Sequence, residues 1–104
     1  MNSKDIEITM RNMLENKNWH NKNSKERKLY EEMCLRKMIM SCLTYNYNIY
    51  TDDYILKFNK VLGEKRVLEI CKEQEKYFKT KCKVISNVGT DWEGVTYNSL
   101  IEEE

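Results

Sequence analysis

The stretch that decides how this chain folds is residues 33–43, Met-Cys-Leu-Arg-Lys-Met-Ile-Met-Ser-Cys-Leu. Only Arg36, Lys37 and Ser41 are polar within it, so its apolar side chains would cover most of the circumference of a helix. A helix of this kind cannot leave one side in water. Two interpretations remain open: the segment from Met33 to Leu43 is the central helix of the fold, or it is half of a homodimer interface.

The helix that contains this stretch is predicted to begin after Ser24, whose hydroxyl is a good cap for free backbone N–H groups. Lys28, Glu32 and Arg36 follow one another at i, i+4 spacing with alternating charge. Residues four apart lie next to each other on a helix surface. We therefore expect these three side chains to form a ladder of ion pairs on the solvated face of the helix.

Three further helices are predicted from apolar spacing and from caps. The first begins at Asn2 or Ser3 and ends near Asn16. The third follows a Thr51 cap and is stopped by Gly63, and the fourth covers residues 64–79. The side chains expected to face inward are Ile6, Met10, Met13 and Leu14 on the first, Tyr54, Ile55, Phe58, Val61 and Leu62 on the third, and Val67, Leu68, Cys71 and Phe78 on the fourth.

The C-terminal part of the chain has a different pattern. Residues 82–88 and 95–101 are rich in β-branched and aromatic side chains and flank Gly-Thr-Asp-Trp-Glu-Gly at 89–94, which predicts a β-hairpin. Residues 45–50, Tyr-Asn-Tyr-Asn-Ile-Tyr, alternate at period two and predict a short third strand. The expected fold class is α+β, with about four helices followed by the C-terminal β-hairpin.

All of this fits into one domain, because 104 residues suffice for a single core. The domain would comprise a helical pair at 1–44, a second helical pair at 51–79 and the hairpin at 82–101.

The amino-acid composition indicates the kind of genome that encodes the chain. The chain has no alanine and no proline, and it is rich in lysine, asparagine, isoleucine and tyrosine, whose codons are rich in A and T. We infer an AT-rich genome.

Charge and hydropathy limit the classes of protein that remain. Residues 1–50 carry nine Lys or Arg against six acids, and residues 81–104 carry two against five. Neither end has the dense charge of one sign that marks a dedicated nucleic-acid or membrane binder. No apolar run approaches a membrane span, and the N-terminus lacks a signal-peptide core. We expect a cytoplasmic protein that does not bind membranes and has a mixed-charge partner.

Enzymatic and metal-binding motifs are not found in the sequence. The four cysteines, expected to be reduced in the cytosol, include no Cys-x-x-Cys pair, and Cys34 and Cys42 would lie about 12 Å apart along one helix. His20 is the one histidine, and no nucleophile motif accompanies it. We therefore predict a protein that is not an enzyme and uses no cofactor and no metal.

Candidate binding residues lie in two places. One is the start of the second helix, where basic side chains join the positive end of the helix dipole and could bind phosphate. The other is the tip of the predicted hairpin. Each place has a tryptophan, which either packs back onto the fold or contacts a partner. The candidates are Trp19, His20, Lys22, Lys25, Arg27 and Lys28 at the first, and Asp91, Trp92 and Glu93 at the second.

Three segments carry a resemblance to a known group of proteins: Leu62-Gly63-Glu64-Lys65, then residues 73–78 (Glu-Gln-Glu-Lys-Tyr-Phe), then residues 88–99 (Val-Gly-Thr-Asp-Trp-Glu-Gly-Val-Thr-Tyr-Asn-Ser). Together they resemble the C-terminal part of small accessory proteins encoded by phages and prophages of low-GC Gram-positive bacteria. The resemblance implies a mobile-element protein without catalytic residues. Many such proteins bind and block a host machine, and anti-CRISPR proteins are one class of them.

Three functions follow as hypotheses. The first is a non-enzymatic inhibitor that binds a host protein or ribonucleoprotein complex, such as a CRISPR or other nucleic-acid-processing defence machine, and occludes it in the host cytoplasm. The second is a small nucleic-acid-binding regulator that uses the basic start of the second helix, as a dimer through Met33 to Leu43. The third is a structural protein of the virion that self-associates through the same methionine-rich segment.

Overall fold

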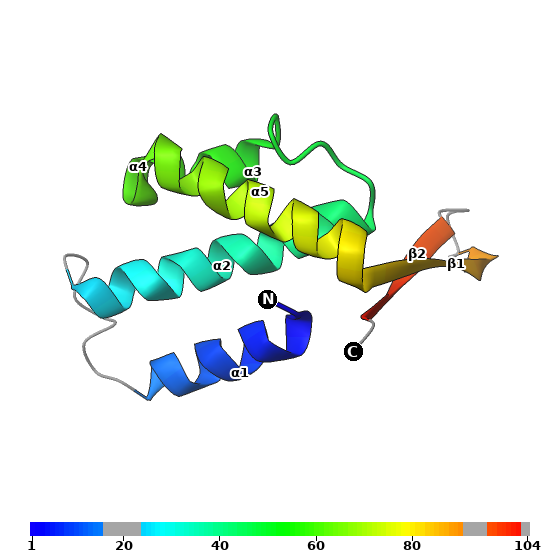
Figure 1. Ribbon diagram of the computed structural model, residues 1–104, viewed down its shortest axis with the longest axis horizontal. Coiled ribbons are helices and arrows are strands. Elements are labelled where there is room, and N and C mark those ends of the chain that lie inside the picture. Colours follow the sequence, from blue (N-terminus) through cyan, green and yellow to red (C-terminus); the bar gives the residue numbers. More distant parts are fainter. Residues whose placement is uncertain (16–23, 91–95, 103–104) are drawn as a thin grey trace.

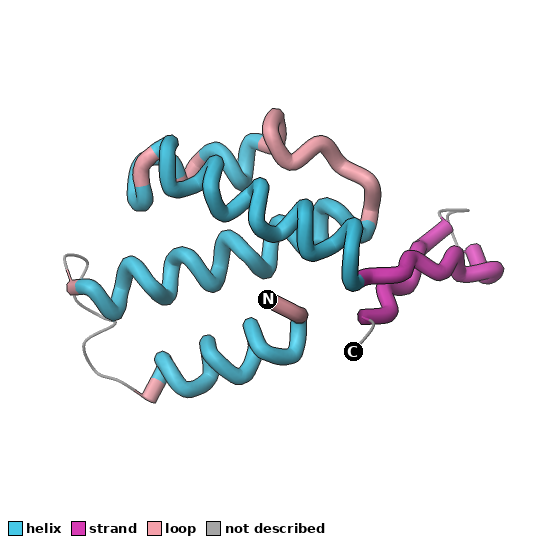
Figure 2. The backbone as a smooth tube through the Cα atoms, viewed as in Figure 1, coloured by secondary structure: helices cyan, strands magenta, loops and turns pink. Residues whose placement is uncertain are grey.

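One long helix, α2, forms the centre of the protein in the computed structural model, which describes residues 1–15, 24–90 and 96–102 (Figure 1). α1 lies along one side of α2, and α3, α4 and α5 lie along the other (Figures 1 and 2). The elements are α1 (Ser3–Leu14), α2 (Lys25–Thr44), α3 (Asp53–Leu56), α4 (Asn59–Leu62), α5 (Glu64–Lys81), β1 (Cys82–Thr90) and β2 (Thr96–Glu102).

α1 and α2 begin at capping side chains that the sequence predicts. The Asn2 side chain accepts a hydrogen bond from the Asp5 N–H at 2.7 Å, and the Ser24 hydroxyl accepts one from the Arg27 N–H at 3.0 Å. Each cap satisfies a backbone donor that the first turn of a helix leaves unpaired. α1 then buries Ile6, which is 1% exposed.

The apolar stretch of α2 is buried inside the chain itself. Met33, Leu35, Ile39 and Met40 are all at most 6% exposed. α1 and α5 both pack against α2, so this helix is covered from two sides. Of the two interpretations, the central helix is therefore the one that the structure shows. The chain itself already covers most of the apolar side chains that a homodimer through Met33 to Leu43 would bury.

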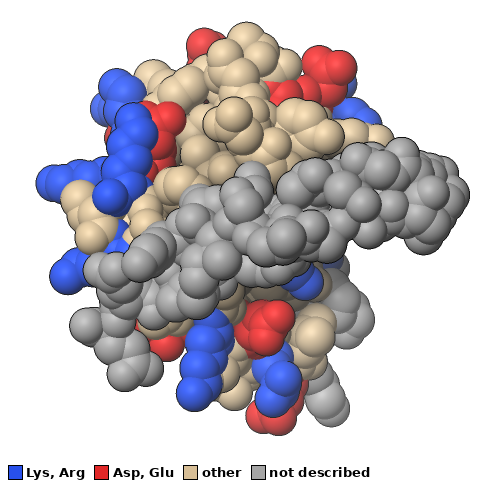
Figure 3. All heavy atoms as spheres, turned by 90° about the vertical axis from the view of Figure 1, so that its right-hand side faces the viewer, with Lys and Arg blue, Asp and Glu red and all other residues tan. Residues whose placement is uncertain are grey.

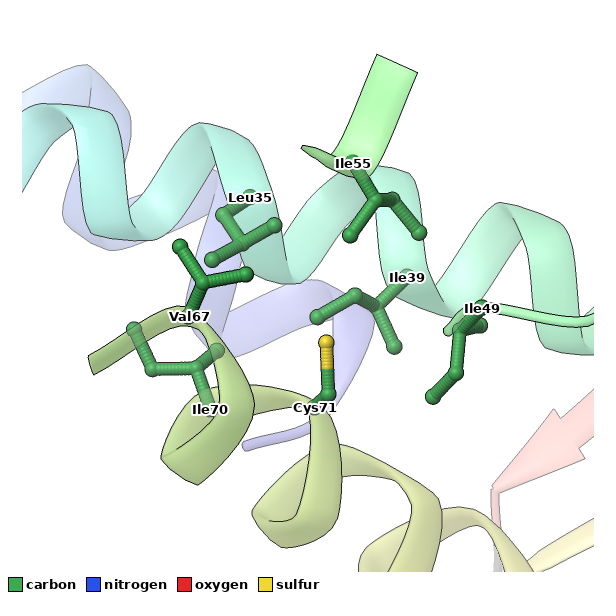
Figure 4. Close-up of a cluster of buried hydrophobic side chains, with 7 residues drawn as sticks. All are labelled: Leu35, Ile39, Ile49, Ile55, Val67, Ile70 and Cys71. Carbon is green, nitrogen blue, oxygen red and sulfur yellow. The ribbon is translucent and has the colours of Figure 1, made fainter. Parts of the chain in front are cut away.

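The main core lies between α2, α3, α5 and the connection at 45–52 (Figure 4). Isoleucine dominates it, and each fully buried isoleucine contributes about 1.5–3 kcal/mol relative to an exposed one. On the face drawn in Figure 3, charged side chains of both signs lie at the edges of an uncharged area. The core residues are Leu35, Ile39, Ile49, Ile55, Val67, Ile70 and Cys71.

The predicted charge ladder on the solvated face of α2 is wrong at Arg36. Its side chain is only 7% exposed, and its Nη2 donates a hydrogen bond to Glu73 of α5 at 3.1 Å. Its Nη1 lies 3.6 Å from Glu32. The reason is that α5 covers this side of α2 and supplies a carboxylate there. Such tertiary partners cannot be read from i, i+4 spacing.

The predicted third helix is two short helices. α3 begins after Asp52, whose Oδ1 accepts hydrogen bonds from the Tyr54 and Ile55 N–H groups at 2.9 and 3.1 Å, so Asp52 rather than Thr51 is the cap. α3 ends at Leu56 and α4 ends before Gly63. Gly63 has φ +87°, a conformation that favours glycine, and it separates α4 from α5.

The predicted α+β fold class is wrong because the protein is mainly helical. Helices account for 78% of residues 1–15 and 24–82. Every buried side chain in these ranges lies on a helix or on the 45–52 connection. Two strands alone cannot enclose a core, whereas five helices can.

Beyond α5 the backbone continues as β1, which pairs antiparallel with β2 (Figure 2). Partners run from Cys82 opposite Glu102 to Ser86 opposite Asn98, and the register then shifts before Thr90 opposite Thr96. The described sheet has these two strands only. Residues 45–50 form turns instead of the predicted third strand.

Candidate functional site

Exposed large apolar side chains concentrate on one part of the described molecule. Ten such side chains are at least 39% exposed, and seven of them belong to the segment 45–68. Tyr47 and Tyr54 are the most exposed, at 63% and 64%. Single exposed apolar residues are ordinary on protein surfaces, but a group of them marks an interaction site.

Three hollows with shared lining residues connect the most exposed of these side chains. Tyr47 and Tyr54 border the first hollow, Tyr54 and Leu56 border the second, and Leu56, Tyr50 and Leu68 border the third. Tyr54 is shared by the first two hollows and Leu56 by the last two, so the three hollows are linked along this part of the surface. We call Tyr47, Tyr50, Tyr54, Leu56 and Leu68 the tyrosine surface.

The end of α2 determines where the tyrosine surface begins. Asn46 has φ +61°, a left-handed conformation that asparagine tolerates better than most residues. The N–H groups of Tyr47 and Asn46 bond to the carbonyls of Cys42 and Leu43 at 2.8 and 3.2 Å. This is the Schellman pattern of helix termination. It turns the chain away from α2 immediately before Tyr47.

Two side chains fix the rest of the connection. Ile49 is 1% exposed and belongs to the core, so it anchors the connection between two exposed tyrosines. The Asn48 side chain accepts a hydrogen bond from the Tyr50 N–H at 3.0 Å. The Tyr50 hydroxyl lies 3.4 Å from the Glu75 carboxylate on α5. The connection is therefore fastened to α2, to the core and to α5.

The third hollow is a groove of about 200 Å³ between α3, α4 and α5. Its volume is below the range of about 300–1,000 Å³ that is usual for small-molecule sites, so it fits a single side chain better than a cofactor. Asn59 lines this groove, and its buried Oδ1 has no hydrogen-bond partner among the described residues.

The segment that carries two of these tyrosines is uncharged. Segment 45–51 contains no charged residue, and Figure 3 shows a wide uncharged area on the side of the molecule where this connection lies. Burial raises the pKa of the Cys42 thiol to about 11, and the Asp52 carboxylate, 3.6 Å from its Sγ, adds to the shift. Burial also raises the pKa of Cys71. Both thiols are thus protonated at neutral pH and poor nucleophiles.

Of the predicted binding residues, the structure describes those at the start of α2. Lys25 and Lys28 are exposed there. Arg27 is already engaged, since its guanidinium lies 2.9 Å from Glu31 and 5.8 Å from the centre of the Tyr30 ring. The other candidates lie outside the described residues. They are Trp19, His20 and Lys22 in the first group, and Asp91, Trp92 and Glu93 in the second.

The tyrosine surface was missed by sequence reasoning, although a signal for it exists. The period-two alternation of residues 45–50 predicts a strand, and that prediction hides the signal. Asn46 just after the last apolar position of α2 is a helix-stop signal, and the tyrosines that follow it are best explained by exposure on a turn.

Neither a family model, nor a curated protein, nor a solved structure matches this chain. The described helices include none with the length and apolar character needed to cross a bilayer. Among the described residues, no group of three or more His, Cys, Asp or Glu side chains could hold a metal ion.

Proposed function

We propose that this protein is a non-enzymatic binding protein that docks on a partner protein through the tyrosine surface and thereby covers part of it. The observation that carries the proposal is the grouping of five exposed apolar side chains along three linked hollows, on a connection that hydrogen bonds and the buried Ile49 hold in place. The resemblance to phage accessory proteins supports a host complex in the host cytoplasm as the partner, and inhibition of it as the outcome.

Tyrosine suits such a role for physical reasons. It offers a large contact area with two rotatable bonds, and its hydroxyl tolerates water before binding. Aromatic side chains are enriched among the residues that dominate binding energies. The exposed Leu56 and Leu68 at the rim of the groove would extend the contact.

The fixed backbone between α2 and α3 lowers the entropic cost of binding. Asn46, Asn48 and Asp52 hold the backbone between α2 and α3 by local hydrogen bonds, and Ile49 fixes it to the core. A segment that is already ordered loses less conformational freedom on association than a free loop does. The tyrosines are thereby presented in a fixed arrangement.

The test is capture from a nuclease-treated lysate of a low-GC Gram-positive bacterium, followed by identification of the retained protein by mass and by titration against it. The double variant Tyr47→Ser/Tyr54→Ser should bind this partner at least tenfold more weakly than the unmodified protein. The matched control is Ile8→Ser/Leu14→Ser, which removes two α1 side chains that are 44% and 49% exposed. Equal affinity of the two double variants would exclude the tyrosine surface as the docking site.

A further inference from the structure

A row of lysines runs along α5. Lys65, Lys72, Lys76 and Lys79 follow at intervals of seven, four and three residues, and all four are exposed. At 3.6 residues per turn they fall within about 60° of one another on the helix, over a length of about 21 Å. We call these four side chains the lysine row.

The carboxylates beside the row are already paired, two with arginines and one with Lys79 of the row itself. Lys65, Lys72 and Lys76, by contrast, have no ion-pair partner among the described residues. Lys72 and Lys76 are four apart, a spacing at which like charges repel and destabilise a helix. The pairs that occupy the carboxylates are Arg66–Glu69 at 3.2 Å, Arg36–Glu73 at 3.1 Å and Lys79–Glu75 at 3.5 Å.

The charge on this side of α5 is therefore positive in sum. Arg36 and Arg66 also share Glu32, so two guanidinium groups serve three carboxylates and this network has a net charge of −1. The three unpaired lysines bring the total to +2.

We propose that the lysine row binds the phosphate backbone of a nucleic acid. Each strand of a duplex presents one phosphate for about every 3.4 Å of helix axis, so the row spans about six phosphates. Lysine is a compact charge on a flexible stem, which suits contact with phosphates without base-specific geometry. The inference does not depend on the tyrosine surface. Leu68 lies on the same helix, so one nucleoprotein could contact both surfaces.

The experiment is fluorescence anisotropy with a fluorescein-labelled 20-base-pair DNA duplex at salt concentrations from 50 to 200 mM. The triple variant Lys65→Gln/Lys72→Gln/Lys76→Gln should bind at least tenfold more weakly than the unmodified protein. It should also reduce the slope of log affinity against log salt by about 2 to 3, because each lost phosphate contact removes about 0.9. All three substitutions are on the surface, and a thermal melt checks that each variant folds.

The matched control is Lys4→Gln/Arg11→Gln/Lys37→Gln, which removes the same charge from three exposed positions on α1 and α2. It should keep an affinity within about threefold of the unmodified protein. Three results would overturn the proposal: no binding of the duplex at 50 mM salt, equal losses in the two triple variants, or binding of polyglutamate as tight as that of DNA. The last would assign the row to an acidic protein instead.

Discussion

Replacing Glu32 by glutamine should lower the free energy of unfolding by about 2 kcal/mol at pH 7. Glu32 is 13% exposed and accepts two hydrogen bonds from Arg66, at 2.6 and 3.1 Å. It also lies 3.6 Å from Arg36. Hydrogen bonds to charged groups contribute about 1.5–3 kcal/mol each. Glutamine retains one acceptor oxygen but turns an NH₂ group toward a guanidinium, so part of this stabilisation is lost.

The cost of the substitution should depend on pH. The hydrogen bonds from Arg66, with the charges of Arg66 and Arg36, hold the pKa of Glu32 below its ordinary value of 4.5. A carboxyl with a lowered folded pKa stabilises the protein above its unfolded pKa, and this contribution disappears as the pH falls through the folded pKa. The difference in free energy of unfolding between the unmodified protein and Glu32→Gln should have its full size above about pH 5. It should shrink steadily below about pH 4.

Thermal unfolding followed by circular dichroism measures both effects. A loss of about 2 kcal/mol corresponds to a fall in Tm of roughly 10 °C for a domain of this size. The control is Glu69→Gln, because Glu69 accepts from the same Arg66 at 3.2 Å but is 51% exposed. Its cost should stay below about 1 kcal/mol. The reasoning fails if the two variants melt alike at pH 7, or if the Glu32→Gln difference persists unchanged at pH 3.

Two further predictions concern the connection that carries the tyrosines. Asn46→Ile should lower the free energy of unfolding by about 1–2 kcal/mol, because a β-branched residue is strained at φ +61°. Asn46→Gly should be tolerated at this conformation. Thermal melting of both variants tests this, and equal Tm values would contradict it. At pH 8, Cys42, with a pKa of about 11, should be alkylated by iodoacetamide far more slowly than a model thiol, since only about one molecule in a thousand is thiolate. Asp52→Asn should speed this reaction, and an unchanged rate would show that the Asp52 carboxylate does not affect the thiol.

The parts of the fold that were predicted correctly depend on local chemistry. Asn2 and Ser24 cap the first two helices because a short polar side chain satisfies backbone donors three residues away. The stretch from Met33 to Leu43 is central because its apolar surface is too wide for a solvated helix. Neither conclusion requires knowledge of which segment packs where.

The errors depend on contacts between distant residues. Arg36 is buried because Glu73, 37 residues later, provides a counter-charge. In a strand, Tyr47 and Ile49 would share one face, yet Tyr47 is 63% exposed and Ile49 is 1% exposed. The left-handed Asn46 and the turns after it break the alternation on which the strand prediction rested. The fold class failed for a related reason, since local β-propensity does not show which segments enclose the core.

The two proposed surfaces meet at Glu75. Its carboxylate lies 3.4 Å from the Tyr50 hydroxyl and 3.5 Å from the Lys79 ammonium. Burial and the Glu75 charge raise the pKa of Tyr50, so its hydroxyl stays protonated at neutral pH and can donate to Glu75. Glu75 therefore fixes one member of the tyrosine surface and neutralises one end of the lysine row. Substitutions at Lys65, Lys72 and Lys76, or at Tyr47 and Tyr54, leave the Glu75 interactions with Lys79 and Tyr50 in place, so these five positions should separate the proposed nucleic-acid binding from the proposed protein binding.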